Sequence, residues 1–178
     1  TFIDFRERAP QSATRDMYLD AAGKPSDESV VGYRASGVPG TVRGLGMALE
    51  KYGSKRWRDL VKPAQKLADD GFELPYSLAK DIAESSRLPQ FDESKRIFLK
   101  GGKAPAYGDI LRQRDLGKTL ARLAKEGPDE FYTGRTAELI ARDMQRNGGL
   151  ITLADLNAYQ PTEREPLRGT YRGYEILS

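Results

Sequence analysis

Apolar residues recur at three- and four-residue spacing along most of the chain, a pattern typical of amphipathic helices. Glycine and proline residues interrupt this pattern and set the expected helix ends. Thr41 is the expected N-cap of the first helix, and Gly53 its C-terminal glycine. The pattern predicts helices over residues 42–52, 57–70, 75–87, 114–125, 134–147 and 153–158, and a single helical turn over residues 128–132.

Several positions refine this prediction. Pro63 falls inside the second helix, so we expect two short helices or a kink near Val61. Gly44 and Gly46 lie inside the first helix, where glycine costs about 1 kcal/mol relative to alanine. We therefore expect them to let another backbone approach closely. Their spacing fits neither the Walker nor the dinucleotide-binding pattern of a phosphate-binding loop. Residues 93–99 are compatible with either a helix or a strand.

The two clearest helices have well-defined apolar faces, and the last helix has a capping signal. Asp155, three residues after Thr152, predicts a capping box at the start of the last helix. The side chains expected to be buried on the two clear helices are Leu116, Leu120, Leu123 and Ala124, and then Ala137, Ile140, Ala141 and Met144.

Residues that favour β-structure gather at the two ends of the chain. Phe2, Ile3 and Phe5 open it, and residues 163–168 and 170–177 indicate two strands around a turn at Arg168-Gly169. We expect these strands to join one sheet. The predicted fold class is therefore α+β: a mostly α-helical layer with terminal strands, in a single domain over residues 1–178.

The composition excludes several kinds of chemistry. Neither cysteine nor histidine occurs in the 178 residues, which excludes disulfides, thiolate nucleophiles, Cys/His metal sites and histidine-based triads. We expect no metal and no cofactor. The formal net charge is +3, from 29 basic and 26 acidic residues, and the charges are interspersed without the basic stripe typical of nucleic-acid binders. No stretch is long and apolar enough to cross a membrane.

The ends of the sequence indicate a piece of a longer protein. The chain starts at Thr1 without a methionine, and it ends in a strand pattern that has no partner after it. Terminal strands without neighbours expose apolar edges, so we expect the isolated piece to self-associate.

Two groups of residues were candidates for catalysis. An N-terminal threonine can be a nucleophile with its own amine as base, but the residues after Thr1 supply no oxyanion donors. Neighbouring carboxylates usually decorate surfaces, and none of those in this chain has a partner that suggests a metal site. These carboxylates are Asp69 and Asp70, Asp129 and Glu130, and Glu163 and Glu165.

Arg6 is the candidate binding residue. It follows an apolar strand, and Pro10 keeps the polar run after it from becoming a helix. Its planar guanidinium can donate two parallel hydrogen bonds to a carboxylate. The residues alone leave two readings open: a structural salt bridge with Glu7, or a site for an anion.

Six motifs, in order and over essentially the whole chain, together resemble the large subunit of the γ-glutamyltranspeptidases. They are Phe5-Arg6-Glu7-Arg8-Ala9-Pro10, Ala13-Thr14-Arg15-Asp16-Met17-Tyr18, Ser36-Gly37-Val38-Pro39-Gly40-Thr41-Val42, Gly127-Pro128-Asp129-Glu130-Phe131-Tyr132-Thr133-Gly134, Gly148-Gly149-Leu150-Ile151-Thr152 and Tyr171-Arg172-Gly173-Tyr174.

The resemblance implies a function for Arg6. In that family the arginine of the first motif binds the α-carboxylate of the γ-glutamyl group, for example of glutathione. The family consists of αββα N-terminal-nucleophile hydrolases that cleave their own precursor, and the new threonine of the small subunit attacks the γ-glutamyl amide. The γ-glutamyl group then passes to water or to an amino acid or peptide.

The resemblance also sets expectations about partners and place. The nucleophilic threonine lies beyond Ser178, and Thr1 does not match its context, so we expect this chain alone to be inactive. Its expected partners are γ-glutamyl compounds and the small subunit of the same precursor, which together with it forms a heterodimer. Because the family is exported, we expect a periplasmic or extracellular parent.

Two alternatives remain open. The parent could be a related acylase or capsule-polymer transpeptidase, although the first motif argues for a substrate of the α-amino-acid type. The chain could also be a non-catalytic helical interaction module.

Overall fold

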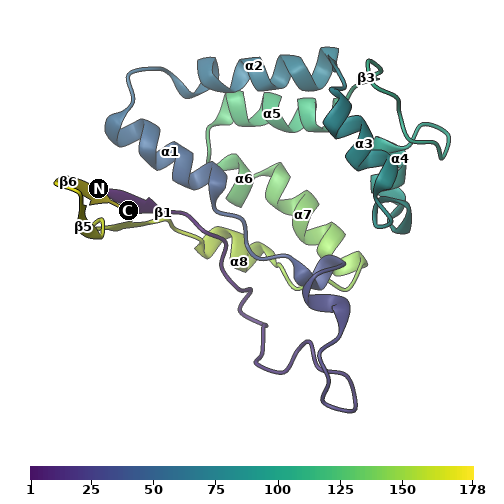
Figure 1. Cartoon of the computed structure of the whole chain (residues 1–178), viewed down its shortest axis with the longest axis horizontal. Helices are drawn as coiled ribbons and strands as arrows, with labels where there is room; N and C mark the ends of the chain where they lie inside the picture. The colour runs from purple at the N-terminus through teal and green to yellow at the C-terminus, as the bar shows by residue number, and fades with distance from the viewer. The chain divides into compact units, whose positions relative to one another are not determined.

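A computed structural model describes all 178 residues, which pack as two compact units. Unit 1 comprises Thr1–Trp57 and Glu126–Ser178, and unit 2 comprises Arg58–Lys125. Both ends of the chain therefore belong to unit 1 (Figure 1). One domain can contain two such units, so the expectation of a single domain stays a prediction.

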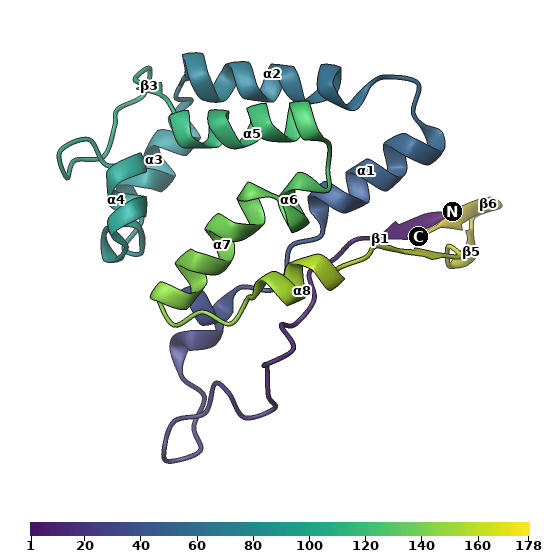
Figure 2. The same cartoon turned by 180° about the vertical axis from the view of Figure 1, so that it is seen from behind.

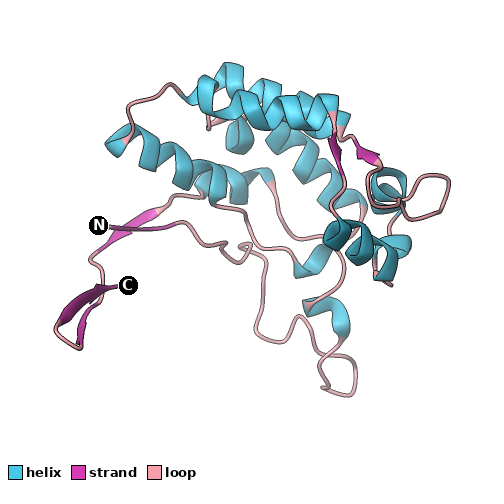
Figure 3. Cartoon of the chain, turned by 45° about the horizontal axis from the view of Figure 1, so that its top comes forward, coloured by secondary structure: helices cyan, strands magenta, loops and turns pink.

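Helix is the main regular structure, and the strands are short (Figures 2 and 3). The helices are α1 (Thr41–Tyr52), α2 (Trp57–Asp70), α3 (Tyr76–Glu84), α4 (Asp92–Phe98), α5 (Arg114–Glu126), α6 (Glu130–Thr133), α7 (Arg135–Arg146) and α8 (Leu153–Ala158), with 3-10 turns at Asp27–Ser29, Tyr33–Ala35 and Leu88–Gln90. The strands are β1 (Phe2–Asp4), β2 (Phe72–Glu73), β3 (Ile110–Leu111), β4 (Thr162–Arg164), β5 (Arg168–Tyr171) and β6 (Tyr174–Leu177). The predicted mixture of a helical majority with strands at the chain ends is confirmed.

Most predicted helices are present. Some of them begin or end at other residues than predicted, because tertiary contacts determine these ends. Helix α1 starts at Thr41, so Gly40 is its N-cap and the predicted Thr41 cap was wrong. A Cβ at Gly40 would overlap the Tyr159 hydroxyl and the Phe5 carbonyl, so packing requires glycine there. Gly53 caps the other end as predicted, donating its N–H to the Leu49 carbonyl at 2.8 Å.

Unit 2 corrects three further details. Helix α2 runs without a break through Pro63, which is exposed, so the two short helices that were one of the predicted outcomes do not form. Helix α3 ends at Glu84, because Ser85 Oγ instead accepts from Leu88 N at 3.2 Å and starts a new turn. Leu116 on α5 is 43% exposed, whereas Gly117 beside it is buried. The ambiguous segment 93–99 forms α4.

The terminal strands do not form one sheet. Strand β1 pairs antiparallel with β4, whereas β5 and β6 form a separate hairpin. The hairpin turns at Arg172-Gly173, where both residues have positive φ (51° and 83°), as in a type I′ turn. The predicted turn at Arg168-Gly169 was therefore wrong, because those two residues lie in β5.

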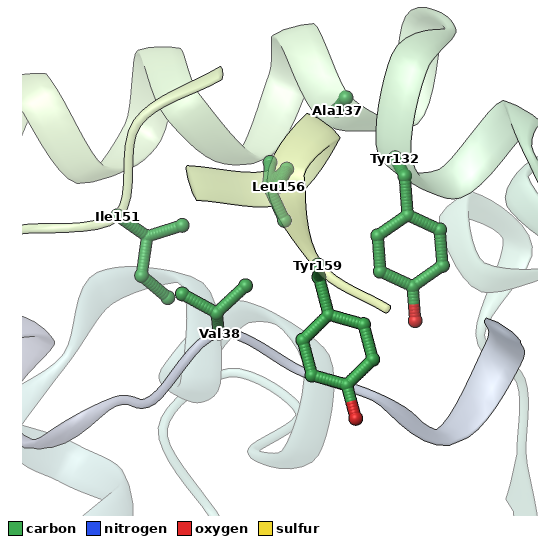
Figure 4. Close-up of a cluster of buried hydrophobic side chains, with 6 residues drawn as sticks. All are labelled: Val38, Tyr132, Ala137, Ile151, Leu156 and Tyr159. Atoms are coloured by element: carbon green, nitrogen blue, oxygen red, sulfur yellow. The ribbon is translucent and has the colours of Figure 1, made fainter. Parts of the chain in front are cut away.

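Each unit has its own apolar core. In unit 1 the buried residues come from α6, α7, α8 and the segments beside them; they are Val38, Tyr132, Ala137, Ile151, Leu156 and Tyr159 (Figure 4). In unit 2 they are Leu74, Ala79, Ile82, Leu99 and Leu111. The predicted burial of Ala137 is thus confirmed. No helix combines the length and the apolar character needed to span a bilayer.

Helix α1 packs closely on the first strand segment through a glycine. A Cβ at Gly44 would overlap the Phe5 ring, and one at Gly46 would lie 2.8 Å from Pro128 Cγ. Close approach at both glycines was predicted for another backbone, and this was wrong: the atoms that approach belong to the Phe5 and Pro128 side chains.

The capping box predicted at the start of α8 is present and extends further than expected. Asp155 Oδ2 accepts from Thr152 N at 2.9 Å, and Thr152 Oγ1 accepts from Asp155 N at 3.2 Å. Asp155 Oδ1 also accepts from Gln11 N at 2.7 Å, which fixes the loop after the Arg6 motif. Burial raises the pKa of Asp155, but the hydrogen bonds from Thr152 and Gln11 outweigh it and hold the pKa below its usual value of 3.8.

We expect Gly44→Ala to destabilise the protein. Helix propensity alone predicts a gain of about 1 kcal/mol, but overpacking against Phe5 costs roughly 1–3 kcal/mol, and overlap with a ring belongs at the upper end. Thermal unfolding should therefore show a net loss of about 1–2 kcal/mol. The control is Gly169→Ala, since an added Cβ there meets nothing within 4 Å; a loss as large in the control contradicts the packing argument.

We expect Asp155→Asn to lose about 1–3 kcal/mol of unfolding free energy at pH 7, because one amide oxygen cannot replace both carboxylate oxygens. Since the folded-state pKa lies below the unfolded value, the carboxylate's contribution is fully present above the unfolded pKa. It is lost as pH falls through the folded-state pKa.

Urea unfolding of both proteins at pH 7 and near pH 3 checks this expectation, and the gap between them should narrow in acid. Asp143→Asn is the control, because its exposed carboxylate accepts one side-chain hydrogen bond, from Asn147. A gap independent of pH contradicts the assigned role.

Candidate functional site

Arg6 lies two residues beyond β1. This strand is held in place by its antiparallel pairing with β4, in the C-terminal part of unit 1. In the β1–β4 register, Asp4 faces Thr162. Asp4 Oδ2 accepts from Arg164 Nε at 2.8 Å, and Asp4 Oδ1 accepts from Arg6 N at 3.2 Å. The bond from Arg164, followed by that from Arg6, holds the pKa of Asp4 below its usual value. The amide side of Arg6 is therefore held by an ionised carboxylate.

The carbonyl side of Arg6 is held as well. The Tyr159 hydroxyl donates to Arg6 O at 2.8 Å. Two residues on, Arg8 and Val38 exchange backbone hydrogen bonds of 3.1 and 2.7 Å. The guanidinium of Arg8 lies 5.4 Å from the centre of the Tyr159 ring and donates to Thr162 Oγ1 at 3.1 Å. The backbone around Arg6 is thus fixed before, at and after the residue.

The Arg6 side chain, in contrast, points into solvent. It is 81% exposed, and its one partner is Glu7, whose Oε1 accepts from Nη2 at 3.0 Å. The pKa of Glu7 is lowered first by its own backbone N–H and then by Arg6, so Glu7 is ionised at neutral pH. An exposed pair of this kind is weak. The Nε and Nη1 donors of Arg6 have no partner within the chain, so the guanidinium can bind a further carboxylate.

Two glycines of the third motif shape the surroundings of Arg6. A Cβ at Gly37 would lie 2.9 Å from Glu7 Cγ, and one at Gly40 would displace the Tyr159 hydroxyl. The bare backbone at these positions therefore lets the Arg6 segment and Tyr159 lie where they do. The first and third motifs are thus parts of one structure.

Five of the six candidate carboxylates have structural partners. Gln65 donates to Asp69, and Lys66 pairs with Asp70. Glu163 accepts from Lys51 at 2.7 Å and from Tyr52 at 3.1 Å. Asp129 pairs with Arg43 at 3.0 Å. Glu130 is buried and accepts from both Thr136 N and Thr136 Oγ1. No three acidic side chains gather as a metal site requires, and the structure brings none of these groups to Arg6.

One pocket of unit 1 lies apart from Arg6. It has a volume of about 790 Å³ and is lined by residues of α1, α6 and α8 and the segments that flank them. Its innermost cation, Arg43, lies over the Tyr132 ring at 4.3 Å and donates to the Tyr159 carbonyl at 2.5 Å. The Arg43 side chain is therefore bound to two tyrosines of the unit 1 core.

Sequence reasoning found Arg6 but missed the residues that hold it. Tyr159 is 153 positions away from Arg6, and nothing in its local sequence signals the contact. Asp155 was identified as a cap, but its bond to Gln11 was not. Thr1 is exposed and directly precedes β1.

Comparison with known proteins places this geometry in a family. All residues from 1 to 178 match the family model for gamma-glutamyltranspeptidase. The glutathione hydrolase proenzyme of Escherichia coli (strain K12) is 51% identical over 181 residues, covering 100% of this chain and 31% of that protein. The acylase ACY 1 proenzyme of Pseudomonas sp. (strain V22) is 38% identical over 183 residues, covering 98% of this chain and 33% of that protein.

A solved structure has the same fold. The crystal structure of Helicobacter pylori gamma-glutamyltranspeptidase matches with a TM-score of 0.97 at 44% identity, over 99% of this chain and 51% of that chain. The chain spans about a third of the length of the curated relatives it matches, as the 31% coverage of the Escherichia coli protein shows. Because the family match extends over every residue and the fold agrees, this chain belongs to the gamma-glutamyltranspeptidase family.

Proposed function

We propose that this chain is part of the large subunit of a γ-glutamyltranspeptidase and that Arg6 binds the α-carboxylate of the γ-glutamyl group. The observation that carries the proposal is an exposed guanidinium with unused donors on a backbone fixed from both sides. A fixed backbone leaves only the side-chain torsions to be ordered when the substrate binds, which favours binding.

The chemistry of the site suits a carboxylate better than a phosphate or a neutral group. The fork of Arg6 matches a carboxylate in a bidentate geometry. Glu7 accepts from one N–H of Nη2 at 3.0 Å. An incoming carboxylate can pair with the other Nη2 N–H together with the Nε or Nη1 donor on the same side of the guanidinium. A second negative charge on the ligand would face the ionised Glu7, so a singly charged carboxylate is preferred.

The remaining steps belong to the rest of the precursor in this proposal. A threonine at the start of the small subunit attacks the γ-glutamyl amide and releases the amine. Water or an amino acid or peptide then takes the γ-glutamyl group from the threonine. The two subunits form a heterodimer with an αββα fold, and the protein acts in the periplasm or outside the cell. Relatives described as proenzymes support processing of one precursor.

An acylase is the second candidate, and a specific observation favours it. A protein named as an acylase proenzyme is 38% identical to this chain. The two candidates differ in what Arg6 meets, because a γ-glutamyl substrate carries an α-carboxylate and a simple side-chain amide does not.

We expect Arg6→Lys in the full-length protein to lower kcat/KM for γ-glutamyl anilide about a hundredfold, since lysine keeps the charge but loses the bidentate fork. For 4-aminobutyryl anilide, which lacks the α-carboxylate, the same change should alter kcat/KM less than about threefold. Steady-state turnover of both anilides gives the comparison.

The matched control is Arg135→Lys, since Arg135 also forms an exposed pair with a glutamate, Glu138, at 2.7 Å. It should leave both substrates unaffected. An equal loss on both anilides in Arg6→Lys contradicts carboxylate binding. A wild type that cleaves simple amides but not γ-glutamyl anilide supports the acylase.

We also expect the chain over residues 1–178 to show no turnover of γ-glutamyl anilide by itself, because the proposed nucleophile lies outside it. The purified chain is assayed beside the full-length protein at equal concentration. Turnover by the isolated chain that is lost in Thr1→Val would instead make Thr1 the nucleophile.

A further inference from the structure

We propose that Tyr159 is a positioning residue for substrate binding, acting through its hydrogen bond to the Arg6 carbonyl. The inference rests on the proposed function of Arg6. It assigns a role in recognition to a side chain that itself never meets the substrate.

The hydrogen bond starts from a rigid, buried side chain. Tyr159 follows the last residue of α8 and is 2% exposed. Its ring is stacked on that of Tyr132, with centroids 5.8 Å apart and planes at 15°. Figure 4 shows the two rings side by side, with both hydroxyls on the same side. Since Tyr132 is fully buried, its stacked ring holds the Tyr159 ring in place.

The hydroxyl has little room to move. Gly40 comes so close that even a Cβ would overlap the oxygen. Burial raises the pKa of Tyr159, so the hydroxyl stays protonated and remains a donor at neutral pH. It therefore donates to Arg6 O from one position, at 2.8 Å.

This hydrogen bond helps to position the Arg6 guanidinium, because no buried residue contacts the Arg6 side chain itself. Its side chain is exposed and its one ion pair is with its neighbour Glu7. The guanidinium is therefore located by the backbone alone, through the Asp4 contact on the amide side and the Tyr159 contact on the carbonyl side. A shift of about 1 Å in a positioning contact can cost as much as a hundredfold in rate.

The test is Tyr159→Phe in the full-length protein, which removes the hydroxyl and keeps the ring. With γ-glutamyl anilide as substrate, we expect KM to rise about tenfold while kcat changes less than twofold, because binding is loosened and the nucleophile is elsewhere. With 4-aminobutyryl anilide, KM should stay within twofold. An unchanged KM for γ-glutamyl anilide overturns the proposal.

Tyr132→Phe is the matched control. It removes a buried hydroxyl from the same stack, one that donates to Pro39 O at 2.9 Å and accepts from Arg43 N at 3.1 Å, with no hydrogen bond to the Arg6 segment. We expect it to lower Tm about as much as Tyr159→Phe while leaving KM within twofold. An equal rise of KM in both variants shows a general loosening of the core and overturns the proposal.

A double-mutant cycle separates this inference from the proposed function. In an Arg6→Ala background, Tyr159→Phe should change KM less than twofold, because its effect passes through Arg6. A full tenfold effect in that background overturns the positioning role. If Arg6→Ala alone leaves KM unchanged, the proposed function fails; if Arg6→Ala raises KM and Tyr159→Phe does not, only the positioning role fails.

Gly40→Ala provides a second probe that keeps the hydroxyl. Its Cβ would push the Tyr159 hydroxyl and the Phe5 carbonyl away. We expect a rise in KM for γ-glutamyl anilide in the same direction as for Tyr159→Phe. A folded Gly40→Ala protein with wild-type KM contradicts the proposal.

Discussion

The pairing of β1 with β4 brings the first residues of the chain against residues more than 150 positions later. Three ladder positions are few, and the pair is supported by the ion pair between Asp4 and Arg164 and by the tyrosine contact at Arg6. This closure adds to the hydrogen bonds that Tyr159 and Val38 form with Arg6 and Arg8 in the segment from Phe5 to Pro10. With it, an arginine in full contact with water has a backbone as well defined as that of a core residue.

Close contacts at glycines explain how helix α1, Tyr159 and the segment before α1 can all pack against residues 5–8. Gly37, Gly40 and Gly44 each lie against a different part of residues 5–8 or against Tyr159. A side chain at any of the three would force the segment outward. Of these three glycines only Gly44 lies inside helix α1, where it costs about 1 kcal/mol of helix propensity but allows the Phe5 side chain to pack against the helix.

Local signals in the sequence predicted local structure. The capping box at Thr152 and the glycine end of α1 depend on residues within one helical turn, and both are confirmed. One failure involves distant residues: the cap of α1 is Gly40, not Thr41, and Tyr159 and Phe5 leave room for no side chain there. The other is local: Arg172 takes a positive φ, which is rare for a residue with a side chain. Leu116 shows the same limit, since periodicity gives a face but not whether that face is covered.

In the candidate site, too, the sequence predicted the local chemistry but not the contacts with distant residues. The chemistry of Arg6 is apparent from the residue type, but the choice between a salt bridge and an anion site required the family resemblance. The structure adds that the pair with Glu7 leaves donors unused. The support from Tyr159 could not be predicted, because a tyrosine at the end of a helix is usually core and its partner is a backbone carbonyl that any residue would supply.

Unit 1 is discontinuous, and this has a consequence for synthesis on the ribosome. Residues 58–125 are contiguous and contain a complete apolar core, so they can fold as soon as they emerge. Residues 1–57 must wait for α6, α8 and β4 before Arg6 acquires its partners. At about 5–20 residues per second, the hundred residues from the end of α1 to Tyr159 take several seconds to make. Throughout that interval Arg6 lies beyond a strand that has not yet paired, so the surroundings of Arg6 are among the last features of this chain to be assembled.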